Sequence, residues 1–309
     1  MEPQNPLMWN NMAMLLGTLG RTSNALEAYD TAFACPDYQF LDNEVKAGIL
    51  AAKASIFNVM KQYEKAKKIC DEAIGLNPKC AIAWSNKSHS FIGLEDYPRA
   101  LIAAEKALKI DRNLYLAWLN KGDALFNMGN LVEAEKDYIK AMEFCSVNVL
   151  GGILTRLVDV QLKLGKSEDA LVSIDKALQR SPNNAVFLNN KGYILLKLNK
   201  YEPSLRAFEK AIRINPQFAN AWCNMGLALS YLYMFDKALT SYDKAIELNS
   251  QYAEAWFGKG SILLVLKRFP DAIDAYQNFI KSARPQDDKN VQWAKMQIRK
   301  LQGAINKQK

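Results

Sequence analysis

A tryptophan or leucine recurs along this chain every 34 residues in five of seven steps. We call these residues anchors: Trp9, Leu50, Trp84, Trp118, Leu154, Leu188, Trp222 and Trp256. The other two steps are 41 and 36 residues, which indicates a longer insertion near Tyr38 to Glu44 and a shorter one near Asn148 to Leu150. Such a period predicts stacked copies of one small unit, each contacting only its neighbours.

Each period is predicted to form two helices. A small residue follows the anchor by 16 positions at Ala25, Ala66, Ala100, Ala134, Ala170, Ser204, Ala238 and Ala272. A second follows by 23 positions at Ala32, Ala73, Ala107, Ala141, Ala177, Ala211 and Ala245, with Phe279 in the eighth copy. A larger filler stands between them, as at Tyr29, Tyr138, Phe208, Tyr242 and Tyr276. The apolar spacing is helical rather than that of a strand, and the small residues let two helices approach closely.

Proline marks the ends of these helices. Pro78, Pro182 and Pro216 each stand six residues before the next anchor and are expected to end the second helix. Pro98, Pro203 and Pro270 stand at the expected start of second helices, where the missing N–H costs little.

The segment Ala117 to Gly122 (Ala-Trp-Leu-Asn-Lys-Gly), followed by Ala134, Tyr138 and Ala141, resembles the tetratricopeptide repeat. The resemblance covers nearly the whole chain. It implies an all-α fold, an α-solenoid forming a right-handed superhelix of about eight helix-turn-helix repeats over residues 1–286, starting near residues 6, 47, 81, 115, 151, 185, 219 and 253. The pattern departs most at Val158 and Gln161 in the fifth repeat and at Phe279 in the eighth.

Both ends of the array carry a signal. Val291, Ala294, Ile298, Leu301 and Ile305 form an apolar stripe at helical spacing after two aspartates, which predicts a C-terminal capping helix over residues 287–309. A partner-binding or dimerising helix is the alternative. Pro3 stands six residues before Trp9, so residues 2–5 are either the tail of an earlier repeat or a simple extension.

Charge and composition limit the partners. The formal net charge is +8, but residues 287–309 supply +4 of it, so the remaining 286 residues are nearly balanced and we expect no nucleic-acid binding. Neither a secretory signal nor a long apolar run is visible, and the five cysteines form no C-x-x-C pair. We therefore expect a cytoplasmic protein with reduced thiols and no membrane span.

The resemblance implies that the first helix of each repeat lines a concave groove and that the residue two positions after the anchor points into it. Five of these eight residues are asparagine, whose amide can pair with both the C=O and the N–H of an extended peptide. The predicted peptide contacts are Asn11, Asn86, Asn120, Arg156, Asn190 and Asn224. Alternatively, the asparagines bond one repeat to the next.

Charged residues in the same helices extend this hypothesis. Arg156 replaces asparagine in the fifth repeat, where its guanidinium either binds a carboxylate of the ligand or is merely exposed to solvent. Lys87, Lys121 and Lys191 follow the asparagine position and either favour acidic ligands along the groove wall or lay their stems over the neighbouring helix.

No motif proposes a reaction. The single histidine, His89, has no catalytic partner placed beside it, and the chain contains no phosphate-binding loop and no metal-spaced cluster, so we expect no metal, no cofactor and no enzyme activity. The array is similar to the repeat region of O-linked N-acetylglucosamine transferases, but without their catalytic domain.

The sequence therefore predicts a noncatalytic scaffold that binds an extended peptide segment of a partner protein. The alternatives are a structural rod that forms homo-oligomers through its solenoid ends, and a substrate-recruiting fragment of a larger protein or complex.

Overall fold

The computed structural model describes residues 5–284 and 287–307. Of residues 306 and 307 it describes the backbone alone. These residues form α-helices and one short 3-10 helix and contain no strand, which confirms the predicted all-α fold. Pro3 lies outside the described residues. The chain divides into two compact units, unit 1 (Met1–Gly165) and unit 2 (Lys166–Lys309), and each is described by itself.

Unit 1 contains nine α-helices among its described residues. They are α1 (Pro6–Thr18), α2 (Thr22–Ala34), α3 (Asn43–Val59), α4 (Tyr63–Leu76), α5 (Ala81–Gly93), α6 (Tyr97–Ile110), α7 (Tyr115–Asn127), α8 (Leu131–Phe144) and α9 (Val147–Lys163), with the 3-10 helix η1 (Pro36–Phe40) after α2. Odd-numbered members are the first helices of repeats and even-numbered members are the second helices.

Unit 2 begins with the second helix of the fifth repeat. Its helices are α10 (Ser167–Arg180), α11 (Ala185–Lys197), α12 (Tyr201–Ile214), α13 (Ala219–Tyr231), α14 (Phe235–Leu248), α15 (Ala253–Val265), α16 (Phe269–Ser282) and α17 (Asp288–Lys307). The predicted stops are confirmed, since Asn77, Ser181 and Asn215, each preceding a proline, cap the ends of α4, α10 and α12.

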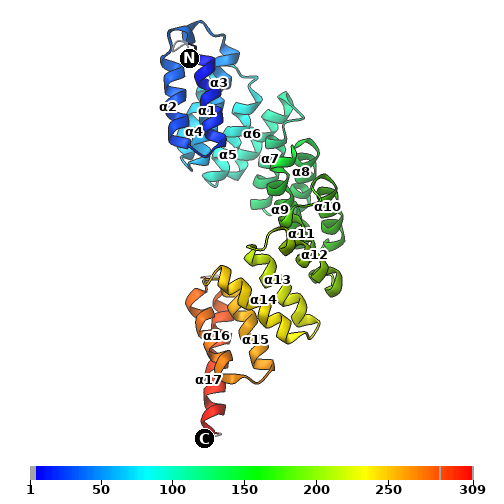
Figure 1. Ribbon diagram of the computed structural model, residues 1–309. Helices are drawn as coiled ribbons and strands as arrows, with labels where there is room; N and C mark the ends of the chain where they lie inside the picture. Colours follow the sequence, from blue (N-terminus) through cyan, green and yellow to red (C-terminus); the bar gives the residue numbers. More distant parts are fainter. Residues whose placement is uncertain (1–4, 285–286, 308–309) are drawn as a thin grey trace. The chain divides into compact units, whose positions relative to one another are not determined.

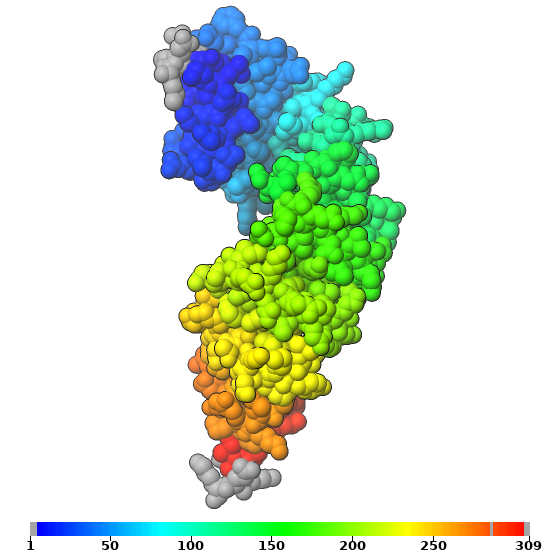
Figure 2. Space-filling model, turned by 45° about the vertical axis from the view of Figure 1, so that its right-hand side comes forward, coloured from blue at the N-terminus to red at the C-terminus, as the bar shows by residue number. Residues whose placement is uncertain are grey.

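Within each unit, successive helices pack as a stack (Figure 1). Inside a unit, a first helix packs against its own second helix and against the second helix of the preceding repeat, as α5 does with α6 and α4. First helices also touch one another, α3 with α5 and α5 with α7 in unit 1, and α11 with α13 and α13 with α15 in unit 2. On the face shown in Figure 2, the repeats of unit 2 adjoin without a gap.

The two insertions lengthen first helices. Both α3 and α9 contain 17 residues, whereas α5, α7, α11, α13 and α15 contain 13. Four extra residues are about one helical turn. The longer insertion also forms η1, so α3 begins at Asn43 and α9 at Val147, each before the repeat start predicted from the anchors.

In four repeats, the indole of the anchor tryptophan holds the preceding turn against the first helix. The N–H of Trp84, Trp118, Trp222 and Trp256 donates to the carbonyl six residues earlier, at 2.8 to 3.0 Å. The acceptors are Pro78, Arg112, Pro216 and Ser250, all in the turns between repeats. Leucine anchors cannot make this bond because they have no donor.

A residue with positive φ ends every first helix. It stands 11 positions after the anchor, as glycine at Gly20, Gly129 and Gly165 and as another residue at Lys61, Glu95, Asn199, Tyr233 and Lys267. A left-handed residue after the last helical turn satisfies its carbonyls, and this conformation favours glycine. The turn thus recurs in all eight repeats although its sequence does not.

In four repeats, close contact between the paired helices depends on a glycine four positions after the anchor: Gly122, Gly192, Gly226 and Gly260. A Cβ built on Gly192 would lie 2.5 Å from the Phe208 ring of its own second helix, and one on Gly122 2.7 Å from the Tyr138 ring. Ser88 takes the same position in the third repeat, where the filler is Ala104. The aromatic filler therefore occupies the space that the glycine leaves open.

Helix α17 covers the end of the array. It packs against α16, and Val291, Trp293, Ala294, Ile298 and Leu301 join the core of the last two repeats. The Trp293 ring lies 5.6 Å from that of Tyr276 at nearly a right angle. This packing covers four of the five residues of the predicted apolar stripe, Val291, Ala294, Ile298 and Leu301, as a capping helix requires.

We expect Gly192→Ala to lower the free energy of unfolding by about 1–3 kcal/mol, because overpacking forces the Phe208 ring or the helix backbone to shift. Gly303→Ala is the control: it lies in α17, where an added Cβ meets nothing within 4 Å. That substitution should be neutral or stabilising, since alanine favours a helix. Urea denaturation of both variants measures the difference, and equal stabilities would contradict the packing argument.

Candidate functional site

Three of the five predicted asparagines, Asn86, Asn120 and Asn224, bond successive first helices in the structure. The Asn86 side-chain amide donates to the Ala51 carbonyl and that of Asn120 to the Ser85 carbonyl, each at 2.8 Å. The Asn86 and Asn120 residues are only 8% and 3% exposed. Both acceptors stand one position after the anchor of the preceding repeat, so these bonds tie each repeat to the one before it.

The other predicted residues are more open. Asn224 is half-buried and donates to the Asn189 side chain at 3.0 Å, and Asn190 is half-buried in α11. Asn11 and Arg156 are exposed. The interhelical alternative therefore accounts for Asn86 and Asn120. Asn224 makes the same kind of bond, but Asn224 and Arg156 retain surface that a ligand can reach.

The lysines that follow the asparagine position form ion pairs with aspartates of second helices. Lys87 pairs with Asp71 at 2.5 Å and Lys191 with Asp175 at 2.7 Å, in both cases on the preceding second helix. Lys121 lies 3.5 Å from Asp137 on its own second helix. These pairs offset the charge that the lysines would present to a ligand, and the stems lie over the neighbouring helix.

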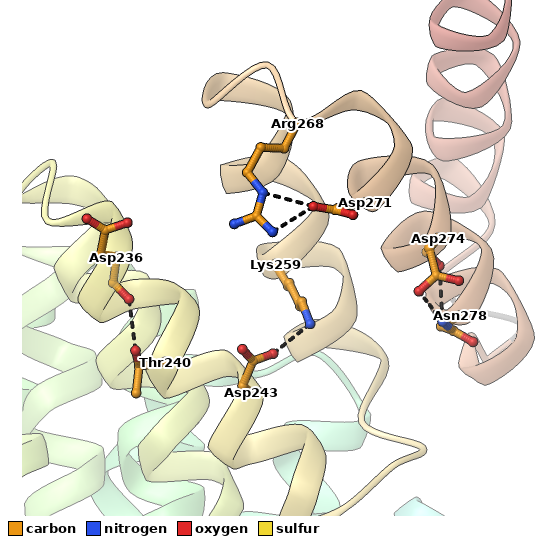
Figure 3. Close-up of polar contacts among 8 residues, drawn as sticks. All are labelled: Asp236, Thr240, Asp243, Lys259, Arg268, Asp271, Asp274 and Asn278. Atoms are coloured by element: carbon orange, nitrogen blue, oxygen red, sulfur yellow. Dashed lines mark hydrogen bonds and ion pairs between the residues drawn. The ribbon is translucent and has the colours of Figure 1, made fainter.

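A further lysine in the eighth repeat follows the same rule. Figure 3 shows Lys259 of α15 reaching Asp243 of α14, at 2.6 Å. The ammonium group also lies 5.5 Å from the centre of the Trp256 ring. Position and partner both match those of Lys87, which lies 5.2 Å from the Trp84 ring.

A cavity of about 320 Å³ opens among the first helices of unit 2. We call it the Asn224 cavity, and its lining consists of Tyr193, Cys223, Asn224, Leu227, Tyr242, Tyr252, Ala253, Glu254, Phe257, Gly258, Phe279, Asp287 and Asn290. Phe279, which breaks the small-residue series, is 3% exposed and packs on Phe257 with ring centres 5.0 Å apart. Aromatic rings thus form much of the wall, and two asparagines, Asn224 and Asn290, also line it.

The Asn224 cavity also explains why the asparagine series stops. Gly258 takes the asparagine position in the eighth repeat, and a Cβ there would lie 2.4 Å from the Tyr242 ring. Tyr242 is 2% exposed and fills the space that the missing side chain leaves.

Charges beside the cavity are largely paired. Arg284 lies 2.5 Å from Glu254, and its Nε lies 3.6 Å from Asp287. Burial raises the pKa of the Cys223 thiol to about 12, so the thiol is protonated and unreactive at neutral pH. The cavity therefore suits an uncharged group better than a strongly ionic one.

A second cavity, of about 310 Å³, lies among the first helices of unit 1. We call it the Arg156 cavity, and it is lined by Ile92, Asp123, Phe126, Asn127, Tyr138, Arg156 and Asp159. The Asp123 carboxylate accepts from the Tyr138 hydroxyl and from Arg156 Nε, both at 2.8 Å. Burial raises the pKa of Asp123, and the Arg156 charge partly offsets that shift.

Among the hydrogen bonds of the described residues, the single histidine has no catalytic partner: His89 is exposed on α5. In the part of the chain that the structure describes, no three His, Cys, Asp or Glu side chains cluster as metal ligands. Across residues 5–284 and 287–307, no helix has the length and apolar character needed to cross a membrane.

The sequence analysis missed the position that lines both cavities most often. It stands five residues after the anchor and places Asp123 and Asp159 in the Arg156 cavity and Tyr193 and Leu227 in the Asn224 cavity. A residue three positions after the asparagine lies on the same helix face. The sequence feature that could have identified this position is its change of residue type from repeat to repeat. The eight residues are Met14, Ser55, His89, Asp123, Asp159, Tyr193, Leu227 and Ser261.

Replacing a bonded asparagine should destabilise the chain, whereas replacing an exposed one should not. We expect Asn120→Ala to lower the free energy of unfolding by about 1–3 kcal/mol, because the buried Ser85 carbonyl loses its partner. Asn11→Ala, at the same repeat position in the same unit, should change it by less than about 0.5 kcal/mol. Urea denaturation compares the two variants, and an equally harmless Asn120→Ala would refute a structural role.

Comparison with solved structures supports the solenoid. The APC/C hetero-tetramer Cut9-Hcn1 matches with a TM-score of 0.58 at 16% identity, over 88% of this chain and 52% of that one. Yeast Tom70 matches with a TM-score of 0.59 at 18% identity, over 92% and 61%. This chain thus corresponds to about half to three fifths of those proteins. YrrB, described as a TPR protein with an unusual peptide-binding site, matches with a TM-score of 0.50 at 25% identity, over 62% and 97%.

Family profiles give the assignment. Profiles described as tetratricopeptide repeat match residues 7–34, 47–80, 87–146, 174–202 and 223–288, and one described as TPR repeat matches residues 192–230. A comparison with curated proteins gave no match. Proteins of this kind generally mediate protein–protein interactions and typically act as noncatalytic scaffolds. Because the profile matches together cover well over half of its length, the chain belongs to the tetratricopeptide repeat family.

Proposed function

We propose that this chain is a noncatalytic scaffold whose unit 2 captures an extended segment of a partner protein at the Asn224 cavity. The observation that carries the proposal is that aromatic rings and the half-buried Asn224 amide line a single cavity. Cavities of roughly 300–1,000 Å³ with apolar walls and a few polar groups are typical ligand sites.

The cavity favours an apolar or aromatic anchor side chain on the ligand. Tyr193, Leu227 and Phe257 offer apolar surface, and the paired acidic groups leave little net charge to attract an ion. Asn224 can bond the ligand backbone beside that anchor through the part of its amide that Asn189 does not use. Such a contact reads the backbone rather than a side chain, so selectivity would come from the anchor.

The Arg156 cavity is proposed as a polar site for the same kind of ligand on unit 1. Two of the five guanidinium N–H groups are engaged, one by Asp123 and one by the Gly152 carbonyl. The remaining donors are available to a peptide carbonyl or carboxylate. Asn86 and Asn120 are assigned to bonding between repeats rather than to the ligand.

One comparison supports peptide binding directly. YrrB carries a peptide-binding site by its description and is 25% identical to this chain over the matched region. The likeness to Cut9-Hcn1 and to Tom70 concerns the fold alone, because both are below 20% identity.

The test uses the full chain and a labelled peptide selected on it from a random display library. We expect Asn224→Ala to weaken binding about fivefold, the value of one net hydrogen bond of about 1 kcal/mol. Leu227→Arg should abolish binding, because it places a charge in the apolar cavity. Fluorescence anisotropy gives both affinities.

Val265→Arg is the matched control. Val265 is 59% exposed on α15 and does not line the cavity, so the same change should leave the affinity intact. Thermal melts monitored by circular dichroism show whether each variant is folded. Unchanged binding by folded Leu227→Arg would refute the site, as would an equal loss in the Val265→Arg control.

A further inference from the structure

A groove of about 770 Å³ lies over α11, between α10 and α12 in unit 2. It is lined by Leu171, Asp175, Leu178, Gln179, Pro182, Leu188, Lys191, Leu195, Pro203, Arg206, Ala207 and Lys210. We call it the Leu188 groove. Its volume exceeds that of each of the two cavities described above.

The groove contains a leucine anchor and is larger than the corresponding pocket beside Trp118, about 770 Å³ against about 480 Å³. Leu188 holds the anchor position of the sixth repeat, and Pro182 stands six residues before it, the place of the carbonyl that accepts from the indole elsewhere. In the next repeat the Trp222 indole reaches the Pro216 carbonyl at 2.9 Å. Leucine leaves that space open, and both Leu188 and Pro182 line the groove.

The floor of the groove is apolar. Leu188 and Leu195 of α11 are 5% and 6% exposed, and Leu171 and Leu178 of α10 are half-buried. Leu171 and Leu178 are seven residues apart, about two helical turns or 10.5 Å. Pro203 and Lys210 cover the same length along α12 on the other side.

The α12 rim of the groove is basic. Arg206 and Lys210 are one turn apart and exposed, and within the part of the chain that the structure describes neither forms an ion pair. Lys191 is also present but is paired with Asp175. Two unpaired cations beside a leucine floor therefore face any molecule that enters.

The net charge of unit 2 adds to the positive potential of these two cations. Unit 2 contains 22 of the 40 basic residues and 13 of the 32 acidic ones, a net +9, whereas unit 1 has a net −1. The positive and negative charges of residues 1–286 nearly cancel, but the excess of positive charge that remains lies in unit 2. A positive patch accelerates the approach of acidic partners and orients them.

We propose that the Leu188 groove binds an acidic amphipathic helix of a partner protein. An apolar face with side chains at i, i+3, i+4 and i+7 covers two turns, which matches the length of the leucine floor. Glutamate or aspartate on the flank of that helix meets Arg206 and Lys210. The ligand is thus defined by two features, a leucine-type face and an acidic flank.

The groove is separate from the proposed peptide site. Leu188, Lys191 and Leu195 lie on one side of α11, whereas Tyr193, which lines the Asn224 cavity, lies five positions after the anchor on another side. A ligand in the groove therefore does not occupy the Asn224 cavity, and the two sites can be tested independently.

The probe is a fluorescein-labelled synthetic helical peptide with leucines at i, i+3, i+4 and i+7 and glutamates on the flank. We expect the full chain to bind it, and to bind the version with glutamine in place of glutamate at least about tenfold more weakly. Salt should weaken the first interaction more than the second, because exposed charges are screened.

Leu188→Trp tests the shape of the groove. The indole should fill the space as it does in the next repeat, donate to the Pro182 carbonyl and leave the chain folded. We expect at least a tenfold loss of probe binding in anisotropy measurements. Unchanged affinity in folded Leu188→Trp would overturn the proposal.

The double variant Arg206→Glu with Lys210→Glu tests the charge without filling the groove, and should also weaken the probe at least about tenfold. The control is Lys237→Glu with Lys281→Glu, which makes the same charge change on exposed positions of α14 and α16. Equal losses in the two double variants would overturn the proposal.

Three further measurements test whether another molecule occupies the Leu188 groove. The proposal predicts that the peptide used for the Asn224 cavity does not displace the probe. A single-stranded oligonucleotide that binds as tightly and loses as much in the Arg206→Glu, Lys210→Glu variant would overturn the assignment to a protein helix. So would self-association that Leu188→Trp abolishes in sedimentation velocity.

Discussion

The contact between a glycine of the first helix and an aromatic ring of the second sets the geometry of the repeats that contain it. Gly192 and Phe208 approach so closely that a single added carbon would lie 2.5 Å from the ring. Since the two helices meet at this point, the opposite side of the first helix is left to face solvent or a ligand. The same rings reach the cavities among the first helices, since Tyr138 lines the Arg156 cavity and Tyr242 lines the Asn224 cavity.

Positions that repeat along the chain and positions that vary have different roles. Asparagine recurs two residues after the anchor, and at Asn86 and Asn120 it bonds neighbouring helices. The position five residues after the anchor changes from repeat to repeat and lines the cavities, as at Asp123 and Tyr193. A bond between identical layers requires the same residue in each layer, whereas one extended ligand presents different groups along its length. Variation was therefore the better indicator of a surface for binding.

The anchor period, the small residues and the prolines were enough to predict two helices per repeat, because each depends on local spacing. Local spacing did not predict the left-handed residue that follows each first helix. Tyr233 and Lys267 adopt the same left-handed conformation as Gly129, although nothing in their side chains favours it. Packing of the two flanking helices imposes that conformation. Likewise, the cavity at Asn224 depends on Phe279 and Tyr242, which belong to second helices and reach the site only through the fold.

A repeat array can gain a binding surface by losing a packing residue. The indole of Trp222 bonds the preceding turn, whereas Leu188 cannot, and the groove at Leu188 is larger than the corresponding pocket beside Trp118, about 770 Å³ against about 480 Å³. Leu50 holds the same position in the second repeat, where a pocket of about 510 Å³ is also found. That pocket is lined by Glu72 and Lys53, and Lys53 is paired with Asp30 at 2.6 Å. Of these two pockets, the Leu188 groove has unpaired cations, Arg206 and Lys210, so its charge distinguishes it from the pocket at Leu50.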